Sequence, residues 1–133
     1  MKLLKGKTIK VFSLLISLVL LFVATDLSAH VKLVDSTPSA NAQIDSTPQQ
    51  LILNFEHPVM LMKLSLTDIG TDKVIDFKFA ATGNLQTNHT YSLPTLTSGD
   101  YSVVWTAMGK DGHNMNGTFK FKLSLSASNS TTK

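Results

Sequence analysis

Residues 99–125 contain the feature that most constrains the fold, an alternation of apolar and polar residues in two successive stretches. A period of two places one face of a β-strand in a core and the other in solvent. A polar segment with three glycines, Gly109, Gly112 and Gly117, lies between the stretches. The sequence therefore predicts a β-hairpin with one buried face. The residues predicted on that face are Tyr101, Val103, Trp105, Phe119, Phe121, Leu123 and Leu125.

The rest of the chain repeats this pattern in shorter pieces. Five stretches read as strands: residues 30–35, 50–55, 60–67, 73–79 and 90–94. Glu56-His57-Pro58 is expected to interrupt the chain between the strands over 50–55 and 60–67. Residues 80–88 read as a loop. Turn signals recur roughly every 8–12 residues, and no helical period persists, which is typical of an all-β sandwich with Greek-key connections. We therefore predict a seven-stranded, immunoglobulin-like β-sandwich.

The first 29 residues read as a secretory signal peptide. Four lysines precede an apolar run over residues 11–24 that is too short for an ordinary membrane helix, and Ala29 supplies a small residue for cleavage. An uncleaved membrane anchor is the alternative interpretation. This layout predicts secretion, one domain over residues 30–125 and a disordered polar tail over residues 126–133.

Cleavage changes the charge of the protein. The leader holds four of the twelve basic residues and one of the nine acidic ones, which leaves eight of each. A near-neutral mature chain gives no basic surface for nucleic acid or for stable membrane association. The chain has no cysteine, so disulfides and thiolate metal sites are excluded.

Three residues suggest a metal site. Cleavage after Ala29 would make His30 the first residue, with its α-amine and ring nitrogen both able to chelate. Asp111 and His113 flank Gly112, and ligands two positions apart can point the same way in a turn. Nitrogen and oxygen donors in a tetragonal set favour Cu(II). The alternative is an ordinary Asp-Gly turn with two exposed histidines.

Four segments together resemble the CopC/YobA family of periplasmic copper-resistance proteins. They are Ala29-His30 followed by a Ser-Thr-Pro turn, residues 51–59, the run Gly99-Asp-Tyr-Ser-Val-Val-Trp105 with Asp111-Gly-His113, and residues 117–121. The resemblance covers about residues 30–123. It implies a Greek-key sandwich that binds Cu(II) through His30, Asp111 and His113.

The chain departs from the family at two places. Members usually read Phe-Ser-Glu-Pro where this chain reads Phe55-Glu56-His57-Pro58, so His57 is either an additional ligand or a surface substitution, and Glu56 is a candidate for orienting an imidazole. A methionine-rich loop for Cu(I) is not evident. Met60 and Met62 share a strand face with Leu64 and Leu66 and are predicted to be core. Met108 and Met115 flank the Asp111–His113 segment without a ligand spacing, and His89 has no partner in sequence.

The leading hypothesis is a periplasmic protein that stores, buffers or transfers Cu(II) without catalysis. Its expected partners are copper and, by the resemblance, an inner-membrane copper transporter or other periplasmic copper proteins. One alternative is a copper-dependent oxidative enzyme, because lytic polysaccharide monooxygenases also use an N-terminal histidine chelate. Another is a metal-free interaction module. A catalytic metal keeps an open coordination position, which Asp111 would tend to fill, and this favours the binding protein.

Overall fold

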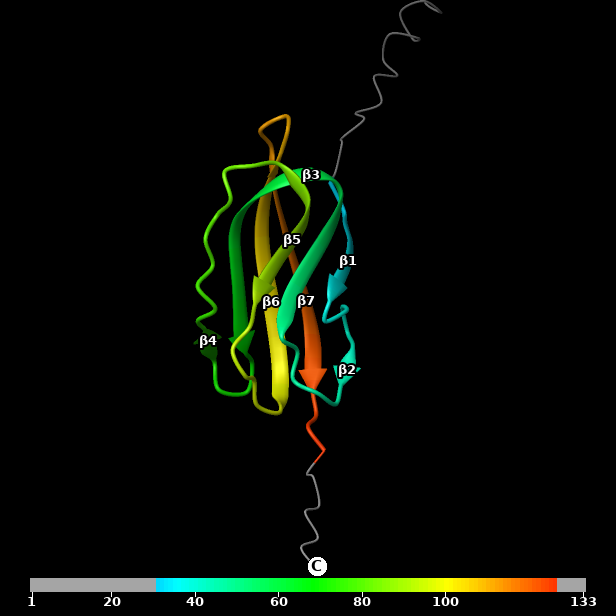
Figure 1. The fold of residues 1–133 in the computed structure, drawn as a ribbon, viewed down its shortest axis with the longest axis vertical. Helices are drawn as coiled ribbons and strands as arrows, with labels where there is room; N and C mark the ends of the chain where they lie inside the picture. The colour runs from blue at the N-terminus through cyan, green and yellow to red at the C-terminus, as the bar shows by residue number, and fades with distance from the viewer. Residues whose placement is uncertain (1–30, 127–133) are drawn as a thin grey trace, which may run out of the picture.

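The computed structural model describes residues 31–126. The predicted signal peptide, His30 and the tail after Ser126 lie outside these residues. Within the described part, strands are the only long elements, and they run in the order of Figure 1. Their bounds are β1 (Leu33–Thr37), β2 (Gln43–Ile44), β3 (Gln50–Asp68), β4 (Lys73–Ile75), β5 (Gln86–Ser92), β6 (Gly99–Gly109) and β7 (Asn114–Leu123).

Strand β3 joins the two layers of the sandwich. It is 19 residues long and arches over one end of the molecule (Figure 1). Its first half pairs antiparallel with β1 and β5, and its second half pairs antiparallel with β4 and β6. β7 continues the second layer beside β6, and β2 pairs with β7 in parallel. The seven-stranded all-β sandwich predicted from the sequence is confirmed.

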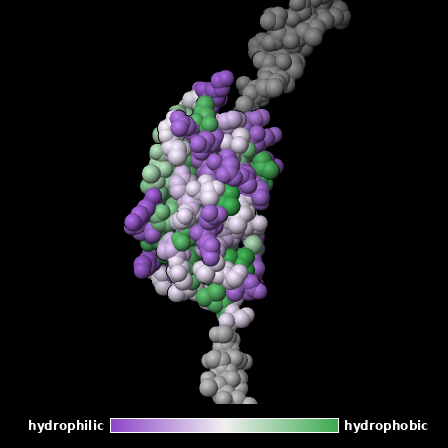
Figure 2. All heavy atoms as spheres, in the orientation of Figure 1, coloured by the Kyte–Doolittle hydropathy of each residue, from purple (hydrophilic) through white to green (hydrophobic). Residues whose placement is uncertain are grey.

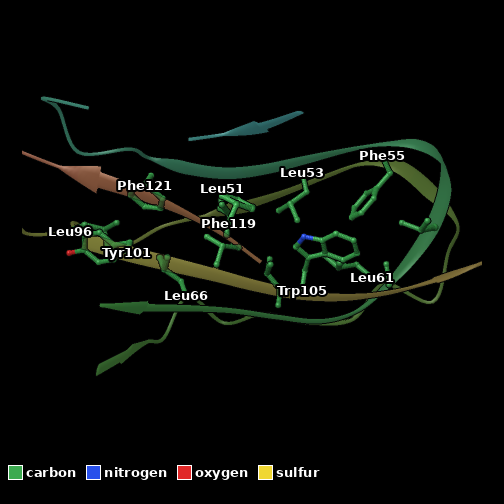
Figure 3. Close-up of a cluster of buried hydrophobic side chains, with 14 of the residues drawn as sticks. Leu51, Leu53, Phe55, Leu61, Leu66, Leu96, Tyr101, Trp105, Phe119 and Phe121 are labelled. Atoms are coloured by element: carbon green, nitrogen blue, oxygen red, sulfur yellow. The ribbon is translucent and has the colours of Figure 1, made fainter. Parts of the chain in front are cut away.

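The core fills the space that the arch of β3 encloses. Figure 3 shows Leu53 and Phe55 from the first half of β3 on one side and Leu61 and Leu66 from its second half on the other. Trp105 lies between them, 6% exposed, with its indole edge-on to Phe55 at a centroid distance of 5.0 Å. The prediction that Trp105 belongs to the core is confirmed.

The prediction that residues 56–58 interrupt the strand is wrong. The backbone of β3 continues through Glu56, His57 and Pro58, all exposed, and only the register with β5 shifts between Asn54 and Val59. The polar triplet is therefore the outer side of a bend and not a break. Phe55 and Val59, on either side of the triplet, are both buried in the core.

The prediction of a core stripe through Met60 and Met62 is also wrong. A bulge between Leu61 and Lys63 adds one residue to β3 opposite β6, so the buried positions change phase at this point. Val59 and Leu61 are buried before the bulge, while Met62 is 44% exposed. Met60 is only half buried and pairs with Met108 of β6.

Four other features of the strands also differ from the expectation. β4 covers only residues 73–75. Phe77 and Phe79 follow it in an irregular segment and pack against the core. β5 begins at Gln86, inside the expected loop, and the short β2 was not predicted. Leu125 lies beyond the end of β7 and is exposed.

The surface gives little sign of a large apolar interface on the face in view. Figure 2 shows hydrophilic residues spread over this face, with hydrophobic ones in small separate groups. The described residues contain no helix long and apolar enough to cross a membrane.

Candidate metal centre

The turn between β6 and β7 is built around Gly112. Its φ of 80° lies in the left-handed region that glycine adopts without strain. The Gly112 amide donates to the carbonyl of Gly109 at 3.0 Å, and the Gly109 amide donates to the carbonyl of His113 at 3.1 Å. These two bonds close the turn and present residues 110–113 to solvent.

Asp111 and His113 meet on the outside of this turn. The Asp111 Oδ2 atom lies 2.9 Å from His113 Nδ1, and Asp111 Oδ1 accepts a hydrogen bond from the His113 amide at 3.1 Å. Both side chains are open to solvent, with 54% of Asp111 and 83% of His113 exposed. The structure therefore brings together the two residues that the spacing around Gly112 singled out.

This pairing determines the chemistry that each group offers. The hydrogen bonds from the His113 ring and backbone amide lower the pKa of Asp111 below its usual value, because they stabilise the carboxylate. A carboxylate accepts only, so His113 Nδ1 carries a proton, and in the neutral imidazole Nε2 is then the nitrogen with a free lone pair. A carboxylate that fixes the tautomer of a histidine in this way is a common partner of metal-binding imidazoles.

The start of the described chain lies against the same turn. The Cγ2 atom of Val31 is 3.7 Å from the point that a Cβ on Gly109 would occupy. Val31, His57, Pro58, Leu85, Lys110 and Asp111 line a hollow of about 560 Å³. The bend of β3, the β6–β7 turn and the beginning of the chain thus meet at one end of the sandwich, as Figure 1 shows.

The structure does not contain a complete metal-binding set among its described residues. Residues 31–126 hold no group of three His, Cys, Asp or Glu side chains placed to bind one ion. His30, the third expected ligand, lies outside these residues and directly precedes Val31 in the chain. Its role as a ligand stays a prediction.

His89 is the residue that sequence reasoning read least well. It is 2% exposed, and its Nε2 atom lies 3.2 Å from the Val59 carbonyl and 3.1 Å from the Gln86 carbonyl, so this nitrogen donates to them. The ring also packs edge-on against Phe55. His89 therefore holds the start of β5 to the bend of β3. No direct signal for this role exists in the sequence. It follows from the pairing of β5 with β3, which places His89 opposite the buried Leu53.

Comparison with known proteins identifies the family. The CopC domain model matches residues 33–124. The chain belongs to the CopC family. Protein YobA of Escherichia coli strain K12 is 30% identical over 98 residues, which are 71% of this chain and 79% of YobA. The YobA protein of Shigella flexneri matches equally well.

Solved structures of CopC proteins share the fold. CopC from Methylosinus trichosporium OB3b superimposes with a TM-score of 0.61 at 27% identity, covering 74% of this chain and 97% of that protein. PcoC from Escherichia coli, described as a methionine-rich copper resistance protein, has a TM-score of 0.55 at 22% identity, with 71% and 99% covered. The second likeness supports the fold alone. The resemblance found in the sequence is confirmed.

Proposed function

We propose that this protein binds Cu(II) in the periplasm and serves copper resistance or homeostasis. The proposed ligands are the α-amine and ring of His30, together with Asp111 and His113. The observation that carries the proposal is the exposed carboxylate–imidazole pair at the β6–β7 turn, with Val31 against that turn. Val31 is the residue after His30, so the expected chelate is one residue away from the segment that contacts the turn.

The donors fit a divalent copper ion. His113 offers Nε2 to solvent while Nδ1 donates to Asp111. The two oxygens of a carboxylate have about four lone-pair positions, so Asp111 can accept its hydrogen bonds from His113 and still bind a metal. Imidazole and amine nitrogens with a carboxylate oxygen suit Cu(II), which also binds most tightly among the divalent first-row ions.

The exposure of the pair suits a protein that takes up and releases copper. An exposed site can be approached by a second protein, and the proposed recipients are an inner-membrane copper transporter or other periplasmic copper proteins. Membership of the CopC family supports this role. The proposal involves no catalytic step.

The test uses the exported protein purified from the periplasm. Intact mass establishes whether the chain starts at His30, and Cu(II) titration of the same sample is followed by Trp105 fluorescence and electron paramagnetic resonance. We expect one tight equivalent with nitrogen-rich tetragonal signals. His113→Ala should weaken binding at least tenfold. Asn116→Ala, an exposed change on the same hairpin, should not.

Two results would refute the proposed function. One is a wild-type protein that starts at His30 and binds no tight copper. The other is a His113→Ala variant that binds as tightly as Asn116→Ala. A mass that includes residues before His30 would remove the amine chelate and leave Asp111 and His113 as a weak pair.

A further inference from the structure

The pairing between β5 and β3 is interrupted at the bend of β3. Asn88 lies opposite Asn54, and the next pair along the two strands is Gln86 with Val59. Residues 55–58 of β3 therefore face a single residue of β5. The pair of Gln86 and Val59 is separated by this gap from the continuous ladder that fixes the rest of β5.

The side chain of His89 bridges this gap. Its Nε2 atom lies 3.2 Å from the Val59 carbonyl and 3.1 Å from the Gln86 carbonyl, so one ring N–H is shared between both members of the isolated pair. Carbonyl oxygens only accept, and Nε2 is therefore the nitrogen that carries the proton. The ring is buried and packs edge-on against Phe55.

The other ring nitrogen of His89 is buried without a partner. Nδ1 is one of two buried side-chain polar atoms in residues 31–126 that make no hydrogen bond, the other being the Thr82 hydroxyl oxygen. In the neutral ring Nδ1 is an unprotonated acceptor. A proton added there would be a charged donor with no acceptor, which is the most costly state for a buried polar group.

No acidic side chain in the described part of the chain is paired with this ring. β5 contains no other acidic or basic residue, and its remaining titratable group, Tyr91, is a phenol. The core cluster behind the ring is apolar. The titratable residues of the neighbouring bend and turn are all exposed: Glu56, His57, Lys110, Asp111 and His113.

The pair that His89 holds also supports the β6–β7 turn. Val59 is paired with Gln86 of β5 and with Gly109 of β6. Gly109 begins the turn, and its amide donates to the His113 carbonyl. Loss of the His89 contact therefore loosens the end of the sandwich that carries the exposed carboxylate–imidazole pair.

We propose that the His89 contact is an acid-sensitive switch, in which the neutral ring holds the start of β5 to the bend of β3 and acidification releases both, together with the β6–β7 turn. Opening brings the ring into water, where an imidazole takes up a proton with a reference pKa of about 6.5. Below that pH the open state binds more protons than the closed state. The closed state therefore loses stability as the pH falls and keeps it above about pH 7.5.

The experiment is amide hydrogen exchange on the purified, metal-free protein at pH 7.5 and pH 5, corrected for intrinsic exchange rates. In wild type, residues 86–88 and Gly109 should open up to about thirtyfold more often at pH 5, if the open state alone takes up the proton. The centre of β6, residues 101–105, should stay more protected than both, which separates local opening from global unfolding.

Two variants assign the effect to one ring. His89→Gln keeps an N–H donor for the two carbonyls and does not titrate, so its opening should be the same at both pH values. His57→Gln removes an exposed histidine from the same bend and is the matched control. It should keep the pH dependence of the wild type.

Three results overturn the inference. They are wild-type opening that does not change with pH, a His89→Gln variant with the wild-type pH dependence, and equal exchange of residues 86–88 and the centre of β6. If His89→Gln does not fold, ¹⁵N NMR of the wild-type ring replaces it. A folded protein at pH 5 with both nitrogens of His89 protonated and unchanged amide protection refutes the switch, whereas an unprotonated Nδ1 in the molecules that stay closed supports it.

Discussion

Gly117 is expected to be the glycine of this fold that least tolerates a side chain. It lies on β7 directly opposite Trp105 of β6. A Cβ at this position would lie 2.2 Å from Cζ2, 2.4 Å from Cε2 and 2.7 Å from Nε1 of the indole. Carbon atoms that are not bonded do not approach so closely. Gly117→Ala must therefore displace a ring that is packed against Phe55.

The size of the effect follows from two opposing terms. Overpacking a well-filled core costs about 1–3 kcal/mol. Replacing glycine by alanine in the unfolded chain returns about 0.4–1 kcal/mol where the backbone permits it. We expect a net loss of about 1–2 kcal/mol, which for a domain of this size lowers the melting temperature by about 4–8 °C per kcal/mol.

Two further variants test the mechanism. Gly83→Ala is the matched control, because a Cβ there meets no atom within 4 Å, and it should be neutral or slightly stabilising. Trp105→Leu combined with Gly117→Ala should cost less than the sum of the two single changes, because the smaller side chain removes the clash. Thermal unfolding by circular dichroism compares these two variants with wild type and with the single variants Gly117→Ala and Trp105→Leu. Gly117→Ala with wild-type stability would refute the packing argument.

Three other predictions concern His89, pH and Asp111. His89→Ala should destabilise the protein by about 1–3 kcal/mol, since it leaves the buried carbonyl of Val59 and the part-buried carbonyl of Gln86 without their donor; denaturant unfolding with an unchanged midpoint would contradict this. Copper affinity should fall as pH decreases from about 7.5 to 5, because protons compete for imidazole nitrogens whose reference pKa is about 6.5. The lowered pKa of Asp111 keeps its carboxylate ionised over this whole range, so Asp111→Asn should bind more weakly at every pH with the same pH dependence. Titrations that show a flat wild-type profile would argue against histidine ligands.

The hairpin of β6 and β7 could be predicted because its information is local. Each of its core residues from Tyr101 to Leu123 follows the period-two pattern, and the turn residues match their spacing. The same argument placed Asp111 and His113 together, since two residues around a glycine share one turn. Local pattern is sufficient where neighbours in space are also neighbours in sequence.

The bulge in β3 could not be predicted in this way. Met60, Met62, Leu64 and Leu66 form a regular alternation, but so do Val59 and Leu61 before the bulge. Over residues 59–62 both alternating sets are apolar, so the sequence there contains two possible buried faces. The pairing with β6 selects between them, and this pairing brings together residues about forty positions apart in the chain.

The hollow that His57 and Asp111 both line could not be predicted from spacing in the sequence. In the sequence His57 is 54 residues from Asp111, and an exposed histidine beside a proline is usually only solvated. The bend of β3 and its antiparallel pairing with β1 bring His57 close to Val31. Val31 also lies against the β6–β7 turn that contains Asp111. Spacing therefore identified the pair that one turn builds, whereas the surroundings of that turn, with Val31 and His57 in one hollow, depend on long-range strand pairing that no local pattern reveals.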